Sequence, residues 1–135
     1  MSKLIPFITI DHASDAIEFY KEVFEAEVQG KITMLNKIPG ADESKHQGKI
    51  GHCSLKISDS VIFINDIVEE HPLTEGDRIQ FVLELETQEK LEKAFELLSK
   101  EGKIVLELQE VFWGAIFGTV KNKFGVTWQI YSGHK

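Results

Sequence analysis

Apolar residues in the first half of the chain follow a strand period, then a helical period, then strand periods again. Residues 4–10 form a short, β-branched apolar stretch that stops at turn or helix-capping residue types, Asp11, His12 and Ser14. Over residues 16–24 apolar side chains recur every three or four positions, which predicts an amphipathic helix. The further segments expected are strands at 27–35, 50–57 and 61–67, and a loop at 36–48.

The second half of the chain repeats this order of elements. An alternating strand is expected at 79–85, and Thr87 is placed to cap a helix whose apolar stripe stops at Gly102. Because Gly is common just after a helix, we expect the helix to end there. The remaining strands are expected at 103–111, 116–121 and 126–132.

The two halves match position by position. Ile5 corresponds to Gln80 near the start of each half, and Val61 corresponds to Val126 near the end. The first pair lies further apart along the chain than the second, and the extra loop accounts for the difference. Internal similarity of this kind predicts two tandem β-α-β-β-β modules in an α+β protein. The modules expected are residues 1–68 and 77–135, within one domain, 1–135.

Strand alternation indicates which side chains point away from the helices. In the second module these include Gln80, Val82, Glu84, Gln129 and Tyr131. In the first module the same reasoning gives Phe7 and His52, together with Ile62, Ile64 and Asp66. A few polar groups among apolar neighbours are typical of a small-molecule site. The ligand-binding residues predicted are Phe7, His52, Ile64, Gln80, Gln129 and Tyr131, with Trp113 stacking from a loop.

Charge and composition exclude several other classes. With 15 Lys and Arg against 22 Asp and Glu, the net charge of −7 is the wrong sign for neutralising the phosphates of a nucleic acid. No apolar run approaches the length of a membrane span, and the N-terminal residues lack the pattern of a signal peptide. Cys53 has no second cysteine to pair with and is expected to be a core residue. We therefore expect a cytoplasmic protein with neither a nucleic-acid nor a membrane partner.

Several segments resemble the vicinal oxygen chelate superfamily of glyoxalases, bleomycin-resistance proteins and extradiol dioxygenases. They are the tandem modules, the AIEFY stretch at residues 16–20 and the stretch FWGAIFGTVKNKFGVTWQI at 112–130. The subfamily resembled is the PhnB-like one, over almost the whole chain. The resemblance implies two modules whose curved, mostly antiparallel sheet surrounds a concave cavity, and it implies a homodimer.

The same resemblance places the superfamily's metal-ligand positions at Ile5, Ile64, Gln80 and Gln129. Isoleucine has no lone pair to donate, and glutamine offers only a neutral carbonyl. We therefore expect no metal and no other cofactor. The subfamily is also labelled by its resemblance to a demethylubiquinone methyltransferase, but this chain has no Gly-rich strand-to-helix loop.

Three classes of function stay open at this stage. The first is a small-molecule binder that works without a metal. The second is an enzyme, a lyase, isomerase or dioxygenase-like relative, in which His52 and Glu84 are the catalytic candidates, with His52 as acid or base or with a metal recruited by His52, Glu84 and Gln129. The third is a structural or protein-binding module. Zinc at His46, His52 and Cys53 fits no structural zinc spacing and lacks a fourth ligand.

Overall fold

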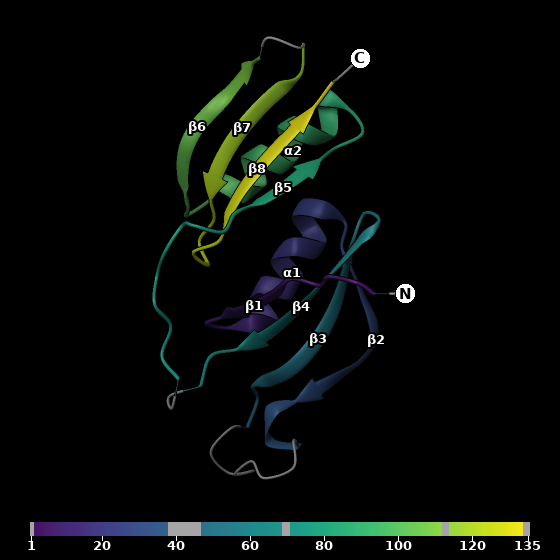
Figure 1. The fold of residues 1–135 in the computed structure, drawn as a ribbon, viewed down its shortest axis with the longest axis vertical. Helices are drawn as coiled ribbons and strands as arrows, with labels where there is room; N and C mark the ends of the chain where they lie inside the picture. Colours follow the sequence, from purple (N-terminus) through teal and green to yellow (C-terminus); the bar gives the residue numbers. More distant parts are fainter. Residues whose placement is uncertain (1, 38–46, 69–70, 112–113, 134–135) are drawn as a thin grey trace. The chain divides into compact units, whose positions relative to one another are not determined.

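Two compact units make up the protein in the computed structural model, which describes residues 2–37, 47–68, 71–111 and 114–133. The units are Met1–Leu73 and Thr74–Lys135. In each, one helix lies against one face of a four-stranded sheet (Figure 1). The fold is therefore α+β with the order of elements that the sequence predicts, and the boundary between the units lies in the stretch expected to connect the modules.

Unit 1 has the expected order of strand, helix and three strands. Its elements are β1 (Phe7–Ile10), α1 (Ala13–Phe24), β2 (Glu27–Met34), the short 3-10 helix η1 (Leu35–Lys37), β3 (Ile50–Ile57) and β4 (Ser60–Asp66). The sheet order is β1-β4-β3-β2, with β1 parallel to β4 and the other pairs antiparallel. Along α1 the apolar stripe is buried, and Ala16, Ile17 and Tyr20 are at most 3% exposed.

Unit 2 repeats this arrangement. Its elements are β5 (Phe81–Glu84), α2 (Gln88–Ser99), β6 (Lys103–Glu110), β7 (Ile116–Lys121) and β8 (Thr127–Ser132). The sheet order is β5-β8-β7-β6, again with one parallel pair, β5 with β8. Leu91, Ala94 and Leu98 of α2 are at most 1% exposed. Within the described part of the chain, no helix is long and apolar enough to cross a membrane.

The correspondence between the units corrects one predicted match. Thr9 and Glu84 are equivalent, because each lies in the first strand of its unit and at the same distance before the helix. Thr9 pairs with Asn65, whereas Glu84 pairs with Tyr131, so Asn65 and Tyr131 are equivalent in the last strands. On this register Val61 corresponds to Thr127, and the predicted match with Val126 is wrong by one position. Because β4 is apolar on both faces, its alternation does not determine the register.

The end of α2 also differs from the prediction. The helix ends at Ser99, before Gly102 is reached, and Glu101 adopts the left-handed conformation with φ of 57°. Gly102 serves a different purpose. A Cβ at this position would lie 2.6 Å from the carbonyl oxygen of Lys121, so only glycine lets the two backbone segments approach.

Candidate functional site

Three aromatic rings gather on the helix-free face of unit 1, the face of its sheet turned away from α1. The ring centroids of His52 and Phe63 are 4.4 Å apart in an edge-to-face arrangement. Phe7 lies 6.3 Å from His52 and 6.1 Å from Phe63. Phe7 is 55% exposed, and the other two rings are half-buried. This face therefore offers apolar ring surface beside an imidazole that can donate or accept a hydrogen bond.

The structure corrects the predicted position of Ile64. In the antiparallel ladder Ile64 pairs with Cys53, and both residues are 0% exposed. Residues paired across a ladder share a face, so Ile64 belongs to the core beneath α1, as do Ile62 and Asp66. Phe63 occupies the helix-free face instead. The error is the same one-position register slip, in a strand that is apolar on both sides.

Two glutamines meet on the helix-free face of unit 2, the face turned away from α2. Gln129 Nε2 donates to Gln80 Oε1 at 2.6 Å, and Gln80 Nε2 donates to the backbone carbonyl of Asp77 at 3.1 Å. Val82, which pairs with Gln129 in the parallel ladder, is 60% exposed beside them. The predicted pair of glutamines is thus brought together within one unit, next to an exposed apolar side chain.

The remaining candidates are placed as follows. Glu84 and Tyr131 are ladder partners on the helix-free face of unit 2, where Glu84 is exposed and Tyr131 is half-buried. Trp113 lies outside the described residues. The two catalytic candidates belong to different units, since His52 is on β3 and Glu84 on β5. The catalytic role of either residue stays a prediction.

A divalent metal does not fit the residues at the superfamily's ligand positions. Ile64 is buried in the core, and the corrected register puts Phe63 at the ligand position. The side chain of Phe63 has no lone pair to donate to a metal ion. The amides of Gln80 and Gln129 hydrogen-bond to each other. Among the described residues, no three His, Cys, Asp or Glu side chains form a group that could hold a metal ion.

The zinc alternative meets a separate obstacle. His46 lies outside the described residues, and His52 and Cys53 are consecutive on β3, so their side chains point to opposite faces of the sheet. Cys53 is 0% exposed. Burial raises the pKa of its thiol, with nearby Lys21 acting in the opposite direction. A buried thiol that keeps its proton is a poor metal ligand and a poor nucleophile.

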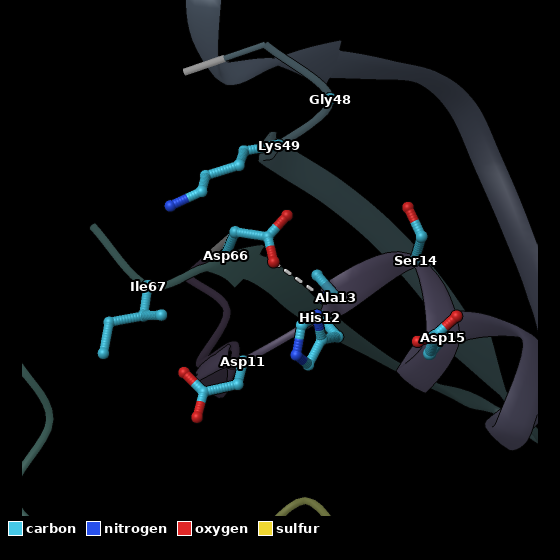
Figure 2. Close-up of a pocket in the computed structure, with 9 residues that line it drawn as sticks. All are labelled: Asp11, His12, Ala13, Ser14, Asp15, Gly48, Lys49, Asp66 and Ile67. Carbon is cyan, nitrogen blue, oxygen red and sulfur yellow. Dashed lines mark hydrogen bonds between the residues drawn. The ribbon is translucent and has the colours of Figure 1, made fainter. Parts of the chain in front are cut away.

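A separate pocket of about 450 Å³ lies where α1 begins (Figure 2). Asp66, only 7% exposed, reaches this point from the end of β4. Its Oδ1 accepts from the backbone N–H of Ala13 at 2.8 Å, and its Oδ2 accepts from that of Ile50 at 2.7 Å. Because both oxygens already accept backbone donors, we assign Asp66 a structural role. The lining residues are Asp11, His12, Ala13, Ser14, Asp15, Gly48, Lys49, Asp66 and Ile67.

Sequence reasoning missed this role of Asp66. The sequence predicts a local cap for α1, at Asp11, His12 or Ser14. His12 occupies the N-cap position in a left-handed conformation, and its side chain makes no capping hydrogen bond. A carboxylate that caps a helix 53 residues earlier in the chain leaves no local pattern. The signal available was an aspartate at the end of a strand whose central residues, 61–64, are all apolar.

Comparisons with known proteins agree with this architecture. A family model described as 3-demethylubiquinone-9 3-methyltransferase matches residues 2–131. Protein YjdN of Escherichia coli is 31% identical over 139 residues, covering 94% of this chain and 92% of that protein. The structure of a putative 3-demethylubiquinone-9 3-methyltransferase, PhnB protein, from Bacillus cereus is 22% identical with a TM-score of 0.82, over 98% of this chain and 100% of that chain.

A third comparison defines the class of fold. The structure of a glyoxalase/bleomycin resistance protein/dioxygenase family enzyme from Burkholderia phytofirmans is 13% identical with a TM-score of 0.66, over 94% of each chain. The paired β-α-β-β-β units thus have the fold of the vicinal oxygen chelate superfamily, as the resemblance implied. Within that class, the chain belongs to the PhnB-like family whose model matches residues 2–131.

Proposed function

We propose that the protein binds a small molecule on the helix-free faces of its sheets, and that it does so without a metal ion. One observation carries this proposal. Phe7 and Val82 occupy equivalent places in the first strands of the two units, and they are 55% and 60% exposed. Both lie beside groups that can hydrogen-bond, His52 in unit 1 and the glutamine pair in unit 2. Exposed apolar side chains among a few polar groups are typical of a small-molecule site.

The chemistry of the two faces supports binding rather than metal chemistry. The rings of Phe7 and Phe63 present faces and edges on which a flat apolar ligand can stack. The amides of Gln80 and Gln129 supply neutral hydrogen-bonding groups that can orient a polar substituent. Isoleucine, phenylalanine and glutamine at the superfamily's ligand positions give a metal ion no charged or imidazole donor.

The proposal is tested by titrating isotope-labelled protein with three uncharged probes, indole, benzyl alcohol and benzamide. We expect the amide resonances of strand residues to shift in a saturable way. The resonances on the exposed faces of α1 and α2 should stay unchanged. Replacing the exposed valine, Val82→Ser, should weaken binding about tenfold, because roughly 1.5 kcal/mol follows from burying such a side chain. Shift changes confined to the helices, or none at any probe concentration, would show that the proposal is wrong.

A matched control separates binding from a general loss of surface hydrophobicity. Val105 on β6 is the same residue type and is 56% exposed. Since β6 and β5, the strand of Val82, are the two opposite edges of the sheet, Val105→Ser should leave probe affinity unchanged. Equal weakening by both substitutions would count against a site at Val82. Homodimer formation, cytoplasmic location and catalysis by His52 stay predictions of the resemblance and the sequence.

A further inference from the structure

The two glutamine amides on unit 2 form a hydrogen-bonded chain whose direction is fixed at one end. A backbone carbonyl can only accept, so the amide of Gln80 must turn its Nε2 towards Asp77, at 3.1 Å. Its Oε1 is thereby directed at Gln129. Since that oxygen can also only accept, Gln129 must donate to it with its own Nε2, and the two atoms are 2.6 Å apart. The orientation of both amides thus follows from one main-chain carbonyl.

These two hydrogen bonds determine which atom of Gln129 is available to a ligand. With Nε2 turned towards Gln80, the Oε1 of Gln129 stays on the helix-free face, and no hydrogen bond within the described residues uses it. Gln129 is half-buried on β8, so its backbone and Cβ are held by the sheet. The face therefore presents a neutral acceptor in a fixed orientation beside the exposed apolar side chain of Val82.

Charged groups around this acceptor add to the same preference. Glu84 and Tyr131 lie on the same face two residues further along their strands, and Glu84 carries a carboxylate. Lys121 of β7 is a cation of the same sheet, and its Nζ lies 3.6 Å from a carboxylate oxygen of Glu75. An anionic ligand would therefore meet the acceptor oxygen of Gln129 and, from β5, the carboxylate of Glu84, whereas the cations Lys121 and its ladder partner Lys103 lie on the other side of β8, in β7 and β6.

We infer that unit 2 selects neutral ligands that carry an N–H or O–H donor, such as primary amides and alcohols, over carboxylates. This inference rests on the proposed function, since it specifies the ligand class of the same face. Gln129 is the group that contacts the ligand. Gln80 is a positioning residue that acts through Gln129. It determines whether donor-bearing ligands or carboxylates are preferred, without supplying the main contact to the ligand.

Benzamide and benzoate make a suitable pair of probes, because they share a ring and differ in donor and charge. Titrated into isotope-labelled protein, benzamide should bind at least about tenfold more tightly than benzoate, since an unpaired buried acceptor or a repelled carboxylate costs more than about 1.4 kcal/mol. Shift changes should include the side-chain amide signals of Gln80 and Gln129, which report on the hydrogen-bonded chain directly.

Two substitutions of Gln80 test the direction of these hydrogen bonds. Gln80→Lys offers Gln129 only donors, so Gln129 must turn its Oε1 to the lysine and its Nε2 to the ligand. The preference should then reverse in favour of benzoate. Gln80→Glu offers only acceptors, so Gln129 keeps its orientation, and the preference for benzamide should persist or grow because the added negative charge also repels benzoate.

Gln109 on β6 provides the matched control. It is an exposed glutamine whose Nε2 also donates to a backbone carbonyl, that of Glu107, at 3.3 Å. Gln109→Lys adds the same charge to the same sheet and should leave the benzamide preference intact. A reversal in this control as well would assign the effect to net charge and overturn the proposed role of Gln80.

The outcomes separate this inference from the proposed function. If both probes bind the helix-free face of unit 2 with equal affinity, the face is a binding site but the preference for donors is wrong. If no probe perturbs the helix-free face of unit 2 but uncharged probes perturb that of unit 1, this inference is wrong while the proposed function stands; if no probe perturbs either face, both fail. If Gln80→Lys keeps the wild-type preference, the hydrogen-bonded chain does not determine the ligand class.

Discussion

The two units begin their helices in different ways, although their elements follow the same order. In unit 1 the N-terminus of α1 is capped by a side chain distant in the sequence, Asp66 at the end of β4, whose Oδ1 lies 2.8 Å from the Ala13 nitrogen. In unit 2, Thr87 caps α2 locally, its Oγ1 accepting from the backbone N–H of Lys90 at 3.1 Å. Ser132, the last residue of β8, occupies the position equivalent to Asp66, the last residue of β4.

The difference shows that the N-terminus of a helix can be capped either by a residue next to it in the sequence or by a residue from a distant strand. The first N–H groups of a helix lack partners within it and need an acceptor. Thr87 supplies one as soon as the chain turns, so the helix start of unit 2 depends on local sequence. Asp66 supplies one only when β4 is in place, and it also accepts from Ile50 at the start of β3. In unit 1, helix start and sheet assembly therefore depend on one carboxylate.

The largest expected effect follows from removing that carboxylate. Asp66→Ala leaves two buried backbone donors without acceptors, and a hydrogen bond to a charged group contributes about 1.5 to 3 kcal/mol. We expect unit 1 to lose at least about 3 kcal/mol in the free energy of unfolding, measured by urea denaturation. Asp59→Ala, at an exposed turn position, is the control and should change stability by less than about 0.5 kcal/mol. Similar losses in both variants would contradict the assigned role.

Cys53 allows unit 1 to be followed separately from unit 2. Its thiol is 0% exposed, so a thiol reagent reaches it only when unit 1 opens. A loss of about 3 kcal/mol in Asp66→Ala should accelerate labelling about 100-fold. Thr87→Ala acts on the other unit and should leave the labelling rate near that of the unaltered protein. An acceleration of about fivefold in Thr87→Ala, which matches its own expected loss of about 1 kcal/mol, would mean that the two units open together.

The same thiol adds a pH dependence whose sign can be stated. Burial raises the pKa of Cys53, so the folded unit holds the thiol proton more tightly than the unfolded chain does. As pH rises past the ordinary thiol pKa of about 8.5, the unfolded chain loses that proton first and the free energy of unfolding falls. Cys53→Ala should remove this part of the alkaline loss, which denaturation at pH 7 and pH 10 would measure.

Most elements of the fold were predictable because their signals are local. The stripe of Ala16, Ile17 and Tyr20 and the stripe of Leu91 and Leu98 each indicate a helix without reference to the rest of the chain. The order of the elements follows from the same local patterns. The errors arise at contacts between distant segments. The sequence predicts that α2 ends at Gly102, whereas the structure shows that the backbone of this glycine approaches β7.

The candidate site was predictable only where alternation was clear. Gln80 and Gln129 are assigned to one face because each lies between two large apolar side chains in its strand, and the structure joins them by a hydrogen bond. The prediction for Ile64 is wrong because β4 is apolar on both sides. The role of Asp66 escapes prediction because its partners lie 53 and 16 residues away, beyond the reach of any local pattern.

A smaller effect is expected from the local cap of unit 2. Thr87→Ala removes one side-chain acceptor at a solvent-exposed helix start, and such caps contribute about 1 kcal/mol. We expect urea denaturation to show a loss of that size, with Thr87→Ser restoring most of it because the hydroxyl is kept. A loss as large as that of Asp66→Ala would remove the distinction between the two kinds of cap.

The smallest effect is expected at Ser132, where unit 2 keeps a polar side chain that its own cap has made unnecessary. Ser132 is 1% exposed, and among the described residues its Oγ has no hydrogen-bond partner. A buried hydroxyl without a partner costs stability, so Ser132→Ala should leave the free energy of unfolding unchanged or raise it by up to about 1 kcal/mol. At the equivalent position in unit 1, Asp66→Ala is expected to lower the free energy of unfolding. If Ser132→Ala instead destabilises unit 2 by more than about 1 kcal/mol, the two positions share a role and the contrast between the units fails.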